Sequence, residues 1–202
     1  MKAGKPSRTV FRLPIYVLIA LTIAFGGGTW ASMRILKATS GFGAISVGPW
    51  DAFPELQTAD ADPYARAHRA DDGRLLFGRA EGLIFTASRD STGRSLSGDC
   101  VYKIDGQTPP ARFWTFRVTD RAGAPVSGLP TAPKSLQSWR LLQDSDGTFH
   151  ATIGGRPHPG NWISMNGDKG VRFVLTLVDT PTAASVSLGE VHLPRISRET
   201  CE

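Results

Sequence analysis

The stretch that decides the fold is "PPARFWTFRVTDRAG", residues 109–123, which holds the densest run of aromatic residues in the chain. Apolar and polar side chains alternate along it with a period of two, as in a β-strand that buries one face. The turn signal "DRAG" at 120–123 ends it. We predict a core strand whose inward face is Trp114, Phe116 and Val118 and whose outward face is Thr115, Arg117 and Thr119.

The same period recurs through the rest of the chain, in short segments separated by turn signals. Seven or eight such strands predict an all-β fold, an antiparallel β-sandwich with a jelly-roll-like arrangement. Residues 135–142 fit either a strand or a single helical turn, and a last strand or pair is expected within 185–193. The clearest segments are 82–88, 100–104, 148–153, 160–165 (a loop entering a short strand) and 170–179 (apolar on both faces).

The N-terminal segment has a different character. Residues 13–32 carry no charge, four basic residues precede them and two follow. Twenty apolar residues are enough to cross a bilayer, and the basic flank predicts a cytoplasmic N-terminus. We therefore predict a cytoplasmic tail (1–12), a single transmembrane anchor (13–33) in the bacterial inner membrane, and a periplasmic main domain. A cleaved signal peptide, with "TWA" at 29–31 as the cleavage site, is the alternative.

Between the anchor and the sandwich we predict a spacer at 34–60, followed by the periplasmic domain at 61–202. The mixture of Gly and Pro with single aromatic residues suggests an irregular or extended spacer. A short helix is expected next, because Asp62 can cap it and Pro63 suits its first turn.

The net charge of +5 does not indicate a nucleic-acid partner. Residues 1–37 contain six of the 23 basic residues and no acidic one, so the rest of the chain has 17 basic against 18 acidic residues. A nucleic-acid-binding domain needs a basic face on the folded part.

The two cysteines, Cys100 and Cys201, fit an exported domain. An even number of cysteines in an oxidising compartment predicts a disulfide, which would also hold down the C-terminal tail. Two unpaired thiols are the alternative.

A larger arrangement resembles a known family. The chain contains "LSGDCVY" (96–102), "PPARFW" leading into a strand, "GNW" (160–162), an apolar strand and "LPRI" (193–196). Together these resemble a bacterial family of exported proteins named domain of unknown function twelve-fourteen, over about residues 45–200. The resemblance implies a β-sandwich. It implies no reaction and no catalytic residue.

The sequence contains no strong motif for catalysis or for metal binding. No G-x-S-x-G elbow is present, and "DSTG" at 90–93 is more simply a hairpin turn than half of an aspartic-protease dyad. The four histidines lack the spacing of a zinc motif, although His150, His158 and His192 could converge. We expect no catalytic residue, no metal and no cofactor.

Two groups of residues remain as candidates for ligand binding. Aromatic walls suit sugars, lipid tails or Pro-rich peptides, and guanidinium groups clamp carboxylates or phosphates. A core position for the aromatic residues and a solvated outer face for the arginines are the alternatives. The candidates are Trp162 and Asn161 in a predicted loop, Trp139, and the set Arg117, Arg172 and Arg140.

We carry three functional hypotheses forward. The first is a binding or scaffolding module of the cell envelope, with an envelope protein, glycan or lipid as partner. The second is a hydrolase acting on an envelope glycan or lipid, which requires convergent carboxylates or a His–Asp pair in a cleft. The third is a structural subunit of a membrane complex, which requires an exposed apolar patch.

Overall fold

The computed structural model describes residues 12–38, 45–53, 63, 66, 70, 81–167, 170–183 and 191–201 of the 202. The chain divides into two compact units, residues 1–42 and 43–202. Residues 63, 66 and 70 are helical, and the rest of the helix predicted after Asp62 lies outside the described residues.

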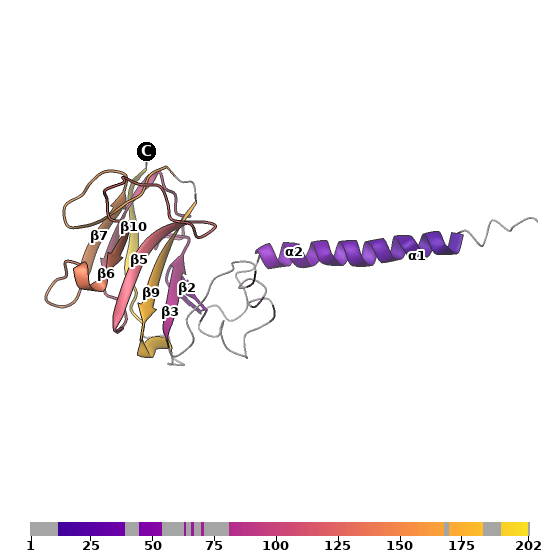
Figure 1. Ribbon diagram of the computed structural model, residues 1–202, viewed down its shortest axis with the longest axis horizontal. Helices are drawn as coiled ribbons and strands as arrows, with labels where there is room; N and C mark the ends of the chain where they lie inside the picture. The colour runs from indigo at the N-terminus through magenta and orange to yellow at the C-terminus, as the bar shows by residue number, and fades with distance from the viewer. Residues whose placement is uncertain are drawn as a thin grey trace, which may run out of the picture. The chain divides into compact units, whose positions relative to one another are not determined.

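The described part of the first unit is one continuous helix. It consists of α1 (Arg12–Thr22), a π-helical segment η1 (Ile23–Gly27) and α2 (Gly28–Ala38) (Figure 1). The 23 residues of Arg12–Arg34 have a mean hydropathy of 1.6 and are long and apolar enough to cross a membrane. The hydroxyls of Thr22 and Thr29 donate to the carbonyl oxygens of Leu18 and Phe25, so their polar groups are satisfied within the helix. A signal sequence would have the same length and composition.

The second unit contains two β-sheets, as the alternating sequence predicted (Figure 1). One sheet has six strands, all antiparallel: β1 (Ile45–Val47), β2 (Trp50–Ala52), β3 (Gly82–Ala87), β9 (Val171–Val178), β5 (Phe113–Asp120) and β6 (Ser135–Gln137). The other has four strands in the order β10 (Arg195–Cys201), β4 (Cys100–Gly106), β7 (Phe149–Gly154) and β8 (Asn161–Ser164). Only the β7–β8 pair is parallel among the described strands.

The inner faces of the strands form one core. Trp114, Phe116 and Val118 are buried, which confirms the face assigned to the opening stretch. Phe116 and Phe173 pack with ring centroids 5.7 Å apart. In β9, Val174 is buried on the opposite face, whereas Val178 on that face is half-buried, so the second face of this strand is only partly covered.

Three expectations from the sequence need correction. Residues 45–52, inside the predicted spacer, form β1 and β2. Trp50 of β2 is fully buried, and its indole N–H donates to the carbonyl of Pro194 at 2.8 Å. Trp162 lies in strand β8 and not in a loop. The last strand begins at Arg195, after the "EVHL" segment expected to supply it, while residues 184–190 lie outside the described part.

Residues 135–142 combine the two alternatives that the sequence left open. The strand β6 is followed directly by the 3-10 turn η2 (Ser138–Arg140). The Ser138 hydroxyl accepts a hydrogen bond from the backbone N–H of Trp114 at 3.2 Å, which fixes the turn against the first residues of β5.

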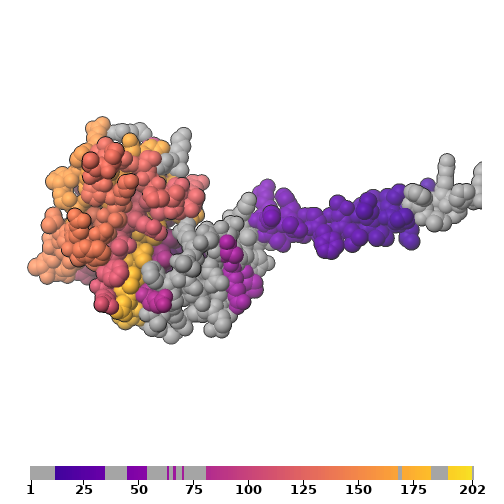
Figure 2. All heavy atoms as spheres, viewed as in Figure 1, coloured from indigo at the N-terminus to yellow at the C-terminus, as the bar shows by residue number. Residues whose placement is uncertain are grey.

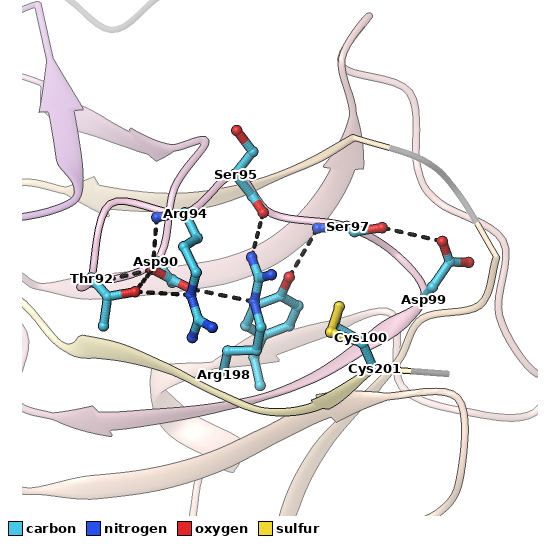
Figure 3. The surroundings of a disulfide bond; sticks show 10 residues. Asp90, Thr92, Arg94, Ser95, Ser97, Asp99, Cys100, Arg198 and Cys201 are labelled. Atoms are coloured by element: carbon cyan, nitrogen blue, oxygen red, sulfur yellow. Dashed lines mark hydrogen bonds and ion pairs between the residues drawn. A yellow bond between two sulfur atoms is a disulfide. The ribbon is translucent and has the colours of Figure 1, made fainter.

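A buried carboxylate ties the turn after β3 to the C-terminal strand. The Asp90 side chain is fully buried, and its Oδ1 accepts hydrogen bonds from the backbone N–H groups of Thr92 and Arg94 and from the Thr92 hydroxyl (Figure 3). Its Oδ2 forms ion pairs of 3.3 Å with Nε of Arg94 and with Nε of Arg198 in β10. "DSTG" is therefore a structural turn, built on hydrogen bonds inside the loop and a long-range ion pair.

The same region contains the disulfide. Cys100 and Cys201 are bonded, as predicted, with a sequence separation of 101 residues (Figure 3). In the chain-entropy model, closing a loop of this length stabilises the folded state by about 4.7 kcal/mol. The bond joins the first residue of β4 to the last residue of β10, so the C-terminal end of the last strand is held against β4.

The Asp90 carboxylate makes the stability of the sandwich depend on pH. Burial alone raises the pKa of Asp90, but the hydrogen bonds from Thr92 and Arg94 and the charge of Arg198 together lower it below the ordinary 3.8. The contribution of Asp90 to the stability of the fold is therefore present above about pH 3.8 and is lost as the pH falls through the lowered pKa.

We expect Asp90→Asn to lower the free energy of unfolding near neutral pH by about 3–5 kcal/mol, because Arg198 then has no buried counter-charge. Urea unfolding of the full chain in detergent micelles measures this. The difference from wild type should narrow in acid, and Asp99→Asn, in an exposed turn, should behave as wild type. Equal stability of Asp90→Asn and wild type at neutral pH would contradict this account.

Candidate functional site

Two hollows lie on the surface beside β8, the edge strand of the four-stranded sheet. The first lies where β8 meets β6, the edge strand of the six-stranded sheet, and the second lies over β4, β7 and residues 142–144. Both are lined by Gly160 and Asn161, so they share one wall. Figure 2 shows that the orange part of the chain, which includes β6 and η2, forms the surface at the left of the sandwich.

The first, which we call the basic hollow, has a volume of about 480 Å³. It is bounded by β6 and η2 on one side and by the start of β8 on the other. Lys134, Arg140 and His158 line it, and none of the described residues that line it is acidic. Other polar side chains that line it include the hydroxyls of Thr131 and Ser135 and the amides of Gln137 and Asn161.

The wall of the basic hollow exists because the segment before β6 runs along β8. Backbone N–H groups of Ser164 and Asn166 donate to the carbonyls of Pro133 and Ser127, at 3.3 and 3.0 Å. Gly128 allows this close approach, because a Cβ there would lie 2.8 Å from the Ser164 carbonyl oxygen. A larger residue at 128 would push the segment away from β8 and open the hollow.

Trp162 is half-buried and contributes a fixed aromatic surface. Its indole N–H donates to the Gly154 carbonyl at 3.2 Å, which holds the ring against β7. Trp162 was predicted to lie in a loop, but it lines the basic hollow from strand β8. Its indole nitrogen is already hydrogen-bonded to the protein.

Asn161 also lines both hollows, but its polar atoms are occupied by the protein. Its Oδ1 accepts from the Leu142 N–H, and its Nδ2 donates to the carbonyls of Leu142 and His150, all at 2.8 Å. Asn161 has 9% of its surface exposed. It shapes the two hollows because it fixes residue 142 beside β8.

The second, which we call the histidine hollow, has a volume of about 440 Å³ and is lined by His150, Asp105 and Asp144. The imidazole of His150 lies between the two carboxylates, with Nδ1 2.7 Å from Asp105 and Nε2 3.3 Å from Asp144. The hydrogen bond that His150 donates to Asp105, and the negative charges of Asp105 and Asp144, raise the pKa of His150 above the ordinary 6.5. This is an acid–base group at the surface of a cleft, with its two ring nitrogens both paired.

The three histidines that the sequence left free to converge do not line one site. His158 faces the basic hollow and His150 faces the histidine hollow, and His192 lines neither. Among the described residues, no group of three or more His, Cys, Asp or Glu side chains is arranged to hold a metal ion.

The predicted arginine set is divided between two places. Arg140 lines the basic hollow. Arg117 and Arg172 lie together on the outer face of the six-stranded sheet, because their partners in the β5–β9 register, Val174 and Thr119, belong to the same face. They are therefore not part of either hollow.

Trp139 is the most exposed of the predicted aromatic candidates, with 63% of its surface accessible. It lies on η2, and its ring packs edge-on against Phe113 with centroids 5.9 Å apart. It does not line either hollow, but it directly precedes Arg140, which does.

Sequence reasoning missed the Asp105–His150 pair and the basic residue Lys134. Asp105 and His150 are direct partners in the β4–β7 register, a pairing of residues 45 apart. The turn signal after Asp105 indicates that this residue lies near a strand end, and the alternation around His150 indicates that its side chain faces outward. Neither signal indicates which residues pair across the two strands.

These features define a class: an antiparallel β-sandwich, in a chain with an N-terminal helix apolar enough to cross a membrane, with a basic hollow at the meeting of two sheet edges. The sequence model of the family described as "Protein of unknown function (DUF1214)" matches residues 81–182, just over half of the chain. The chain belongs to this family, which confirms the resemblance seen in the sequence. No curated protein matches it significantly.

One solved structure shows a similar fold. The VPA0106 protein from Vibrio parahaemolyticus superposes with a TM-score of 0.58 at 14% identity, over 98% of this chain and 47% of that one. The chain thus spans about half the length of that protein, and at this identity the likeness concerns the fold alone. A putative uncharacterized protein from Burkholderia cenocepacia is 18% identical over 88% of this chain and 51% of its own, but its TM-score of 0.36 carries no argument.

We predict that His150 titrates above 6.5 in the folded chain and that Asp105→Asn lowers its pKa more than Asp144→Asn does. Because the pKa is raised, the ion pair between His150 and Asp105 stabilises the fold below about pH 6.5. This contribution is lost as the pH rises through the pKa of His150 in the folded chain. Imidazole proton shifts in a pH series measure the titration. An unchanged midpoint in Asp105→Asn would show that the 2.7 Å contact does not exist in solution.

Proposed function

We propose that this chain is a membrane-anchored binding module of the bacterial cell envelope, whose basic hollow takes an anionic, hydroxyl-rich ligand such as a sugar or glycerol group carrying a phosphate or carboxylate. The observation that carries the proposal is the lining of the hollow. Lys134 and Arg140 supply positive charge without an acidic neighbour among the described lining residues. Hydroxyl and amide groups supply hydrogen bonds, and Trp162 supplies an apolar surface.

The dimensions support a small ligand. A volume of about 480 Å³ is within the range of about 300–1,000 Å³ that small-molecule sites have. Guanidinium and ammonium groups together bind carboxylates and phosphates through charge-assisted hydrogen bonds, and an aromatic face accommodates the C–H face of a sugar ring. A hollow of this kind favours ligand binding over a purely scaffolding role.

The proposed location rests on the N-terminal segment and the disulfide. The helix Arg12–Arg34 is apolar enough to cross a membrane, and the basic residues concentrated before it favour a cytoplasmic N-terminus. A disulfide between Cys100 and Cys201 fits an oxidising compartment, so the sandwich is proposed to lie in the periplasm.

A second candidate function is hydrolysis of an envelope glycan or lipid, favoured by the Asp105–His150 pair in the histidine hollow. A histidine oriented by a carboxylate is a common general base. Here, however, Nε2 is 3.3 Å from Asp144, so the nitrogen that would take a proton from water is paired with a carboxylate. We therefore place binding first.

The test uses glucose 1-phosphate and glucuronate as probes, with glucose as the neutral control. We expect both anions to shift the Trp162 indole N–H signal of the full chain in lipid nanodiscs and glucose not to do so.

Lys134→Gln combined with Arg140→Gln should weaken binding by about 10- to 100-fold, since hydrogen bonds to charged groups contribute about 1.5–3 kcal/mol.

Arg117→Gln combined with Arg172→Gln is the matched control, because it removes two positive charges outside the hollow. Binding of glucose as strong as that of the anions, or an equal loss in this control, would reject the basic hollow as the site.

A further inference from the structure

The basic hollow and the histidine hollow are neighbours along two segments of the chain. Gly160 and Asn161 line both hollows. In the segment before β7, Arg140 lines the basic hollow and Leu142, two residues further on, lines the histidine hollow. The two hollows therefore adjoin each other and share a wall at residues 160–161.

No side chain stands up from this shared wall. Gly160 is exposed, and a Cβ atom there would meet no atom of the described residues within 4 Å, its chain neighbours left aside. Its φ of +84° lies in the left-handed region, which favours glycine, so the backbone keeps this position free of a side chain. The buried Asn161 side chain bonds the backbone of Leu142 and His150. Open space above Gly160 thus leaves room for one ligand to extend from one hollow into the other.

The charges in the histidine hollow are paired within the protein. The imidazole of His150 lies between the carboxylates of Asp105 and Asp144. The ammonium of Lys103, which also lines this hollow, forms an ion pair with Glu199 of β10. A ligand there meets mostly compensated charge, in contrast to the basic hollow, where none of the described lining residues is acidic.

The histidine hollow offers hydrogen-bonding groups instead. The hydroxyl of Thr152 and the amide of Gln143 line it, and neither side chain is hydrogen-bonded to another described residue. The carboxylates of Asp105 and Asp144 keep lone pairs beside their contact with His150, because a carboxylate has about four acceptor sites. Hydroxyl groups both donate and accept, so an uncharged, hydroxyl-rich unit fits this lining.

Each hollow by itself has the size of a small-molecule site. Their volumes, about 480 and 440 Å³, both lie in the range of about 300–1,000 Å³ that such sites have. A monosaccharide phosphate bound at Lys134 and Arg140 occupies only the basic hollow. The histidine hollow is then left for a further unit of the same ligand.

We propose that the two hollows are adjacent subsites of one cleft, which binds a glycan of at least two units. Its anionic unit lies in the basic hollow, its neutral unit lies in the histidine hollow, and the bond between them passes above Gly160. The inference rests on the proposed function, because it takes the anion to bind at Lys134 and Arg140. It deepens that function by naming the ligand class as a charged oligosaccharide.

The experiment compares glucose 1-phosphate with maltose 1-phosphate, which carries one more neutral glucose unit. Calorimetry on the full chain in nanodiscs of phosphatidylcholine measures both affinities. We expect maltose 1-phosphate to bind about tenfold more tightly, because the second unit adds one or two hydrogen bonds. Maltose, which lacks the anion, should bind more weakly than either phosphate.

Filling the histidine hollow tests where the second unit lies. Thr152→Phe places a ring in this hollow and should lower the affinity for maltose 1-phosphate to that for glucose 1-phosphate. Thr176→Phe is the matched control, because Thr176 is a half-buried threonine on the outer face of the six-stranded sheet, and it should keep the difference between the two phosphates. Asp144→Ala removes an acceptor from the histidine hollow at an exposed position without adding bulk, and it should also reduce the difference.

Equal affinities for the two phosphates in the wild-type chain would overturn the inference and leave the proposed function standing. Binding of neither phosphate would reject both. An equal loss in Thr152→Phe and Thr176→Phe would overturn the inference as well. So would a full difference that persists in both Thr152→Phe and Asp144→Ala, because the second unit would then bind outside the histidine hollow.

Discussion

The sandwich depends on how its last strand is attached. β10 has only one strand neighbour, β4, and it lies at the edge of the four-stranded sheet. Three long-range contacts hold it there: the Cys100–Cys201 disulfide, the buried ion pair between Asp90 and Arg198, and the Ser91 turn, whose N–H and hydroxyl bond the backbone of Ile196. The turn after β3 thus connects the six-stranded sheet to the four-stranded one. With the two sheets fixed together, their far edges, β6 and β8, meet in one defined geometry.

The candidate binding features lie beside the edge strand β8. The basic hollow, bounded by β6 and β8, and the histidine hollow, over β4 and β7, both adjoin the segment 137–144, which Asn161 fixes beside β8. Strand β1 forms the other edge of the six-stranded sheet.

Much of the fold could be predicted, because alternation of side chains is a local property. Trp114, Phe116 and Val118 belong to the core, as the period of two indicates. The disulfide was predicted because an exported domain with an even number of cysteines favours one. Strands β1 and β2 were missed because each has three residues and lies among Gly and Pro. The site could be predicted only in part. Trp162 and Arg140 line the basic hollow, but Arg117 and Arg172 lie elsewhere, and the Asp105–His150 pair depends on strand register, which alternation does not determine.

The central claim is that the β6–β8 edge is the recognition surface. Hydrogen exchange measured by mass spectrometry tests it without choosing a residue in advance, by comparing the full chain in lipid nanodiscs with and without glucose 1-phosphate. The account predicts slower exchange with glucose 1-phosphate at 131–144 and 158–162, with the β3 and β9 backbone unchanged. Unchanged exchange in those two segments, together with protection at the outer face of the six-stranded sheet, would contradict it and move the site to Arg117 and Arg172.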